Sequence, residues 1–228
     1  MTGLRLPAIV FGAVVVVASV AGLRQPGRAA DQNSLSPAQI ALFESDHLAR
    51  IRRPATLDYA FRHDGPGTYD DSVSLAVRAV HGDGAKDVSV EFLSGARRVE
   101  FPPVAAFHGN PLIMYFLEWD VLGMHKATGG SALYFRNRIR DAFVDRAQIS
   151  KVSITIDGRA QPATAIVLQP YRDDPEIERY ASFRDKTYRF VLSDSVPGMV
   201  YEIRASLPGV AGGAPASADR VTYTGMRQ

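Results

Sequence analysis

Alternating hydrophobic and polar positions fill much of the chain after its first quarter and predict β-strands. Residues 72–79 alternate apolar side chains with polar or small neighbours, and residues 87–92 repeat the pattern. Successive side chains of a strand point to opposite faces of its sheet, so a period of two predicts half-buried strands with one core face. The alternation returns at 151–156, 188–192 and 201–205. We expect eight or nine strands in all.

Short turn sequences separate these segments and indicate how the strands pair. Asp157-Gly158 suits a two-residue hairpin, because both turn positions tolerate a positive φ. Ser94-Gly95 and Pro197-Gly198 occupy the corresponding places at two other strand ends. Strands joined by turns this short run antiparallel. The chain shows neither an internal repeat nor a linker that would divide it.

Two segments have the helical period instead and are expected to pack on the sheet. Ser36-Pro37 is typical of a helix start, and Pro54 bars continuation after residue 51. The apolar stripe of this first helix consists of Ile40, Phe43, Leu48 and Ile51. Asn110-Pro111 opens a second helix, about 112–126, whose apolar residues surround nearly its whole circumference. A helix that is apolar all round is buried or covers something apolar.

The first 30 residues have the order of a secretory signal. Residues 6–23 form an uncharged run of 18, which Arg5 precedes and the small-residue stretch 27–30 follows. This order predicts a signal peptide, residues 1–30, with cleavage near residue 30. The run is also just long enough to remain as an uncleaved N-terminal anchor. In both cases we expect residues 31–228 to form a single exported, periplasmic, β-rich domain.

Composition and charge exclude several classes of function. The 228 residues include no Cys, which excludes disulfides, thiolate metal sites and thiol nucleophiles. The net charge of +2 depends on three arginines in the first 30 residues, and removing those three from 26 leaves 23 basic residues against 24 acidic ones. A domain so balanced has no global electrostatic reason to bind nucleic acid.

Candidate catalytic and metal-binding residues are scattered along the chain. The five histidines lack metal-binding spacings, so we expect no metal and no cofactor. Glu118 and His125 share a face of the central helix but lie two turns apart, too far for a direct hydrogen bond. The carboxylates at 173–178 lack the spacing of a calcium loop and instead predict a helix cap at Asp174-Pro175. Serine-nucleophile motifs are also missing, so a non-catalytic function is favoured.

Arginines beside aromatic residues give the strongest functional indication. Arg136, Arg138 and Arg140 follow Tyr134-Phe135. On a strand the three would share one face and could bind phosphate or carboxylate headgroups, whereas on a helix they would spread around it. A solvated face is the simpler interpretation, yet an amphipathic lipid needs both arginines for its head and an apolar helix for its tails. The candidate ligand-binding residues are Met114, Phe116, Leu117, Trp119, Tyr134, Arg136, Arg138 and Arg140.

The order of these elements resembles the periplasmic half-barrel proteins of the lipoprotein-carrier (LolA-like) class. The resemblance is one of layout over about residues 36–226, and no short motif carries it. It implies an α+β, β-rich fold: a curved antiparallel sheet, as a half-barrel or open barrel, with an N-terminal helix and an apolar central helix packed on it. It further implies a carrier or sensor of acyl chains in the bacterial envelope.

Three functions follow as hypotheses. The first is a non-catalytic periplasmic protein that binds lipid or lipoprotein acyl chains between the concave sheet face and the helix at 112–126. In the second, that helix is an interface or simply the core of a structural or assembly protein with an envelope protein partner. The third is a hydrolase whose acid and base, for example Glu118 and His125, meet only in the fold. Membrane contact is expected to be transient, or made through an uncleaved N-terminal segment.

Overall fold

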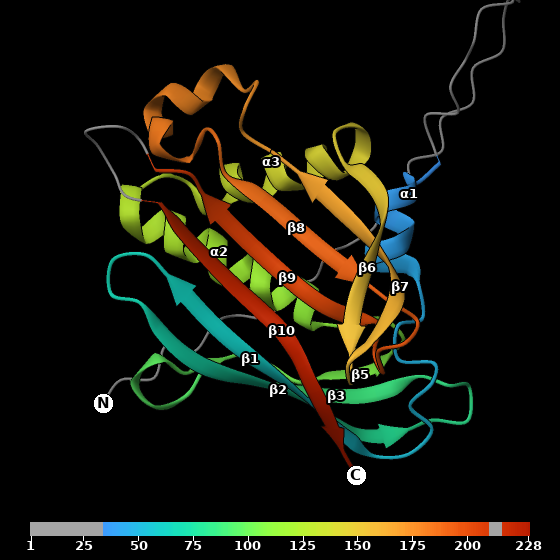
Figure 1. Cartoon of the computed structure of the whole chain (residues 1–228). Helices are drawn as coiled ribbons and strands as arrows, with labels where there is room; N and C mark the ends of the chain where they lie inside the picture. The colour runs from blue at the N-terminus through green and yellow to red at the C-terminus, as the bar shows by residue number, and fades with distance from the viewer. Residues whose placement is uncertain (1–33, 210–215) are drawn as a thin grey trace, which may run out of the picture.

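Ten antiparallel strands form one sheet in the computed structural model, which describes residues 34–209 and 216–228 (Figure 1). The strand order is β4-β3-β2-β1-β10-β9-β8-β7-β6, and β5 also pairs with β3. The two end strands do not pair with each other, so the curved sheet is an open half-barrel, as expected. The strands are β1 (Ala55–Asp64), β2 (Tyr69–Val80), β3 (Lys86–Phe92), β4 (Val99–Glu100), β5 (Val104–Phe107), β6 (Gln148–Ile156), β7 (Arg159–Leu168), β8 (Thr187–Leu192), β9 (Val200–Leu207) and β10 (Ser217–Arg227).

The register of the sheet follows the alternation in the sequence. Leu75 of β2 pairs with Val90 of β3, and both side chains are buried. A slip of one residue would move every side chain of a strand to the opposite face, so burial of one face fixes the register. The structure has ten strands, one more than the upper end of the expected eight or nine. The strand that was not predicted is β5, which is only four residues long and directly follows two prolines.

The turns agree with the sequence at two places and differ at a third. Asp157 and Gly158 both have positive φ and join β6 directly to β7. Pro197-Gly198 lies in the turn between β8 and β9. The prediction of a two-residue hairpin at Ser94-Gly95 is wrong: the 3-10 helix η2 (Gly95–Arg97) intervenes, and the return strand β4 begins only at Val99.

The N-terminal helix is shorter than the sequence suggests. Ser36 caps it as expected, with a reciprocal pair of hydrogen bonds to Gln39, but α1 (Pro37–Gln39) continues only into the π-helix η1 (Ile40–Glu44). The predicted continuation to residue 51 is wrong, because Ser45 takes an extended conformation and ends the helix. Leu48 and Ile51 still enter the core from the following turns, whereas Ile40 is exposed.

Two antiparallel helices cover the inner face of the sheet (Figure 1). The first, α2 (Leu112–Thr128), begins where the Asn110 Oδ1 accepts a hydrogen bond from the Leu112 N–H at 3.1 Å, and ends at Gly129 with a φ of 67°. The second, α3 (Ala132–Asp145), starts at the Ser131 cap. It carries the three arginines, which are therefore on a helix and not on a strand. The helices of the described residues include none long and apolar enough to cross a membrane.

The predicted helix cap at Asp174-Pro175 is confirmed. The 3-10 helix η3 (Pro175–Phe183) starts at Asp174, whose Oδ1 accepts a hydrogen bond from the Glu176 N–H at 3.0 Å. The acidic residues that follow lie in its first turn, where the helix dipole favours negative charge. The predicted signal peptide, residues 1–30, lies outside the described residues.

Candidate functional site

The space between α2 and the sheet, where the sequence placed a ligand, is filled by aromatic side chains. The Trp119 ring lies 5.3 Å from Phe61 and 5.6 Å from Phe92, measured between ring centroids. Phe116 contacts the same indole at 5.8 Å and is fully buried. Phe116 and Trp119 therefore belong to the core under the sheet.

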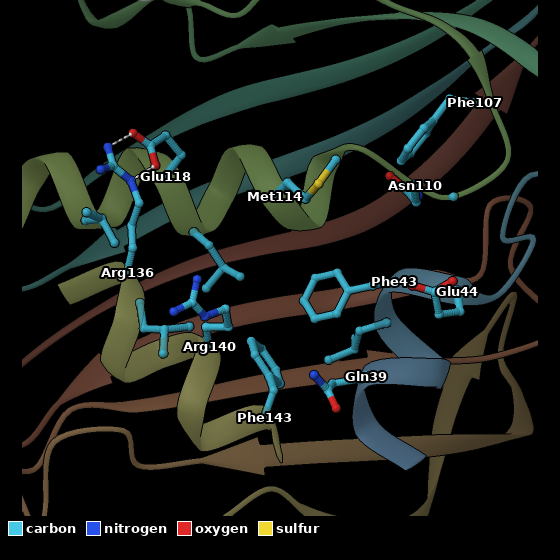
Figure 2. Close-up of a pocket in the computed structure, with 15 residues that line it drawn as sticks. Gln39, Phe43, Glu44, Phe107, Asn110, Met114, Glu118, Arg136, Arg140 and Phe143 are labelled. Carbon is cyan, nitrogen blue, oxygen red and sulfur yellow. Dashed lines mark hydrogen bonds and ion pairs between the residues drawn. The ribbon is translucent and has the colours of Figure 1, made fainter. Parts of the chain in front are cut away.

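An apolar pocket lies on the opposite side of α2, among η1, α2, α3 and the loop that leads from β5 to α2 (Figure 2). Its cavity volume is about 310 Å³. Phe107 and Phe143 form part of its boundary. The other apolar side chains of its wall are Leu42, Phe43, Met114, Leu117, Val121 and Ile139.

Helical spacing explains how the two helices build this wall. On α2 the lining residues are Met114, Leu117, Glu118 and Val121, and on α3 they are Arg136, Ile139, Arg140 and Phe143. Each set follows the spacing i, i+3, i+4, i+7, which places the side chains on one helix face. The two helices thus present equivalent faces to one cavity.

Contacts between the elements hold the pocket together. The Ser36 Oγ donates a hydrogen bond of 2.6 Å to the Phe143 carbonyl oxygen, which ties the start of α1 to the end of α3. Phe43 of η1 meets Phe143 edge to face, with ring centroids 5.1 Å apart. Aromatic pairs in this geometry contribute about 0.5–1.5 kcal/mol beyond their buried area. These contacts make η1 a fixed wall of the pocket.

Buried polar groups fix the loop at the other end of η1. The Asn110 N–H donates to the His47 Nδ1 at 3.2 Å, and the His47 Nε2 lies 2.8 Å from the Ala41 carbonyl oxygen. This pattern requires a neutral imidazole with its proton on Nε2. Burial lowers the pKa of His47, against smaller opposing effects of the Ala41 carbonyl and Asp46. Asn110 also donates from Nδ2 to the Gly198 carbonyl oxygen at 3.0 Å and so links the pocket to the β8–β9 turn.

Arg136 and Glu118 form a bidentate ion pair at the edge of the pocket. The Arg136 Nε lies 2.7 Å from the Glu118 Oε2, and the second guanidinium nitrogen lies 2.5 Å from Oε1. The hydrogen bonds that Arg136 donates to Glu118 raise the pKa of Arg136, although partial burial opposes this. The pair joins α2 to α3 and neutralises both charges.

Arg138 and Tyr134 point away from the pocket and hold η3 against α3. The Arg138 Nε donates to the Asp174 Oδ2 at 2.8 Å, and the Tyr134 hydroxyl donates to the same oxygen. The Arg138 guanidinium lies 5.4 Å from the Tyr134 ring centroid. Burial alone would raise the pKa of Asp174, but the hydrogen bonds from Tyr134 and Glu176 and the charge of Arg138 together lower it.

Arg140 differs from Arg136 and Arg138, the other two arginines of the predicted cluster. It lines the pocket, and Figure 2 shows its guanidinium directed from α3 into the space toward α2. Within residues 34–209 and 216–228 it has neither a hydrogen-bond partner nor an ion-pair partner. The pocket therefore combines an apolar wall with two charged groups that have no partner among the described residues, the Arg140 guanidinium on α3 and the Glu44 carboxylate on η1.

The proposed acid and base of a hydrolase do not meet. Glu118 is engaged with Arg136, and the His125 Nδ1 lies 2.5 Å from the Gly130 carbonyl oxygen. Asp120, on the sheet side of α2, pairs with Lys186 at 2.6 Å and accepts a hydrogen bond from the Tyr188 hydroxyl at 2.5 Å. In the part of the chain that the structure describes, His, Asp and Glu side chains form no group of three that could hold a metal ion.

Four of the eight candidate residues line the pocket, namely Met114, Leu117, Arg136 and Arg140. The other walls of the pocket, from η1 and from the apolar face of α3, were not among the predicted ligand-binding residues. The apolar face of α3 could have been predicted from the sequence, because Phe135, Ile139, Ala142 and Phe143 follow helical spacing. Of these four residues, Ile139 and Phe143 line the pocket.

Comparisons with known proteins concern structure alone. No protein-family model matches the chain, and no curated protein sequence matches it. The chain is similar to the solved structure of the lipoprotein LppX of Mycobacterium tuberculosis, with 8% identity and a TM-score of 0.30, over 76% of this chain and 86% of that one. It is also similar to a LolA superfamily protein from Nitrosomonas europaea, with 8% identity and a TM-score of 0.21, over 83% of this chain and 92% of that one. The strand order and the end strands β4 and β6, which do not pair with each other, define the half-barrel.

Proposed function

We propose that this protein binds a hydrophobic ligand without catalysis, holding one acyl chain of a lipid or lipoprotein in the pocket between η1, α2 and α3. The observation that carries the proposal is the apolar wall that three helical segments build around about 310 Å³. Small-molecule sites are concave, mostly apolar and about 300–1,000 Å³ in volume. The cavity is at the lower end of this range, which favours a single chain over several.

The driving force would be burial of hydrocarbon in a preformed site. Each methylene transferred from water contributes about 0.8 kcal/mol, so two added carbons are expected to tighten binding roughly 15-fold. This gain should stop once the alkyl chain fills the pocket, and longer probes should then bind no better. The immobilised chain offsets part of the gain through its lost rotational freedom.

The proposed site differs in place from the one expected between the sheet and α2. Phe116 and Trp119 occupy that space as core residues, and Tyr134 and Arg138 are engaged with Asp174. Met114 and Leu117 remain as candidate contacts for a ligand tail, together with Leu42 and Phe43 of η1.

The cellular location is part of the same proposal. The basic, apolar and small-residue order of residues 1–30 supports export of a single domain, residues 31–228, to the periplasm of a bacterial envelope. Lipids and lipoproteins must cross this aqueous compartment, where their hydrocarbon chains need shelter from water.

A substitution that fills the cavity tests the proposal. We expect Leu117→Trp to weaken binding of dodecanol, an uncharged single-chain probe, at least tenfold, because the indole would occupy the space of the alkyl chain. Leu133→Trp is the matched control, since Leu133 is 61% exposed on α3 and does not line the pocket. Titration calorimetry on the purified protein measures both. Equal binding by Leu117→Trp and wild type, or no binding by wild type, would contradict the proposed site.

A further inference from the structure

We infer that the pocket selects single-chain amphiphiles with an anionic head, a carboxylate or a phosphate, and that Arg140 binds this head. The inference rests on the proposed function and deepens it, because it names the chemical class of the ligand. It depends on an observation separate from the apolar wall, namely which of the three arginines on α3 have a carboxylate partner.

The three arginines of α3 have different partners, although they are spaced two residues apart. Arg136 makes two hydrogen bonds to Glu118, and Arg138 makes one to Asp174. Both guanidinium groups are thus already neutralised by a carboxylate of the protein. Arg140 has no such carboxylate among the described residues, so it retains the capacity to bind an external anion.

The position of Arg140 suits a headgroup contact. It follows Ile139 and precedes Phe143 on the face of α3 that lines the pocket. Figure 2 shows its guanidinium at the boundary of the cavity, on the α3 side and next to the apolar side chains. A ligand tail among those side chains would therefore place its head beside the guanidinium, while the exposed Arg140 side chain keeps the head accessible to water.

The chemistry of guanidinium favours oxyanions. It stays protonated in proteins and offers five N–H donors in a planar fork, which matches the two oxygens of a carboxylate or phosphate. Charge-assisted hydrogen bonds of this kind are about twice as strong as neutral ones. Carboxylate and phosphate share this recognition, so a free fatty acid and a lipid phosphate are two sources of the same ligand chemistry.

The acidic residues of the pocket do not compete for this role. Glu118 is already bound to Arg136. Glu44 of η1 lines the pocket too, but Figure 2 places it on the far side of Phe43 from Arg140. A cationic head would have to bind at Glu44, so a cationic probe distinguishes the two ends of the pocket.

Four probes with the same dodecyl chain test the inference by titration calorimetry at neutral pH: dodecanoate, dodecyl phosphate, dodecanol and dodecylamine. The three charged probes are kept below their micelle-forming concentrations and dodecanol below its solubility limit. We expect wild type to bind both anions about tenfold more tightly than dodecanol, with dodecylamine weakest. Arg140→Gln should remove this preference, so that dodecanoate and dodecyl phosphate bind this variant no more tightly than dodecanol does. Arg140→Lys should restore part of it, because the charge returns without the planar fork.

Arg172→Gln is the control for net charge, because Arg172 is an exposed arginine that does not line this pocket. It should bind all four probes as wild type does. Tighter binding of either anion supports the inference, and their ratio separates carboxylate from phosphate ligands. Unchanged dodecanoate affinity in Arg140→Gln, or a preference for dodecanol or dodecylamine, would overturn the inference while the proposed function stands. Failure of all four probes to bind wild type would overturn both.

Discussion

The two faces of α2 are both apolar, yet they meet different surroundings. On the sheet side, Phe116 and Trp119 pack into a continuous cluster of aromatic rings. On the other side, Met114, Leu117 and Val121 face an apolar cavity that η1 and α3 enclose. A helix that is apolar all round can thus serve the core with one face and a ligand with the other.

The charged groups on the two sides of α2 differ in whether they have partners. On the sheet side, the buried Asp120 is satisfied by Lys186 and Tyr188. On the pocket side, Glu118 is satisfied by Arg136, but Arg140 is left without a partner among the described residues. The buried carboxylate on the sheet side thus has a structural role, whereas the unpaired Arg140 guanidinium beside the cavity is the group on which the inferred headgroup contact depends.

The largest expected effect is a difference in protein stability between alanine substitutions on the two faces of α2. Phe116→Ala should lower the free energy of unfolding by about 3–5 kcal/mol, because it leaves a cavity in a close-packed core. Leu117→Ala should lower it by only about 1–2 kcal/mol, because the half-buried side chain already borders an empty space. Urea unfolding of both variants gives the values.

Equal losses in those two variants would show that both faces of α2 are core. A Leu117→Ala loss as large as that of Phe116→Ala would therefore remove the distinction on which the proposed site depends.

A smaller effect concerns pH and the wall of the pocket. Because burial lowers the pKa of His47 below 6.5, the unfolded chain binds a proton there more readily than the folded one. The free energy of unfolding should therefore fall as the pH drops below about 6.5, and level off below the folded pKa. Protonation would also turn Nδ1 into a donor facing the Asn110 N–H.

His47→Gln removes this titration and supplies the comparison. The difference in unfolding free energy between wild type and His47→Gln, measured by urea titration over a pH series, should shrink or reverse toward acidic pH. The other histidines contribute to both proteins and cancel in the difference. A difference independent of pH would mean that His47 is not held neutral in the folded state.

The strands were predictable because one buried face imposes a period of two, and the register of β2 and β3 confirms it. The caps at Ser36 and Asp174 were predictable because each depends on a local hydrogen bond. The end of η1 was not predictable. Ser45 takes an extended conformation there, and no proline or glycine in the sequence marks the position as a helix end.

The candidate site was only half predictable for a similar reason. The apolar circumference of α2 is visible in the sequence, but periodicity cannot tell which face meets the sheet. The alternating arginines of α3 suggested a strand as readily as a helix, and only their carboxylate partners, Glu118 and Asp174, distinguish Arg140 from the others. Those partners come from distant segments and are brought together by the fold.

The central claim, that a ligand binds on the pocket side of α2, is tested most directly by locating a bound ligand by NMR. In methyl-labelled protein titrated with dodecanoate, the NMR resonances of Leu42, Leu117 and Ile139 should shift and show nuclear Overhauser contacts to the alkyl chain. The methyl resonances of Leu57 and Leu75, which are buried under the sheet, should stay in place. Contacts from the alkyl chain to Leu57, Leu75 or the Trp119 indole, with none to Leu117, would place the ligand on the sheet side and contradict the account.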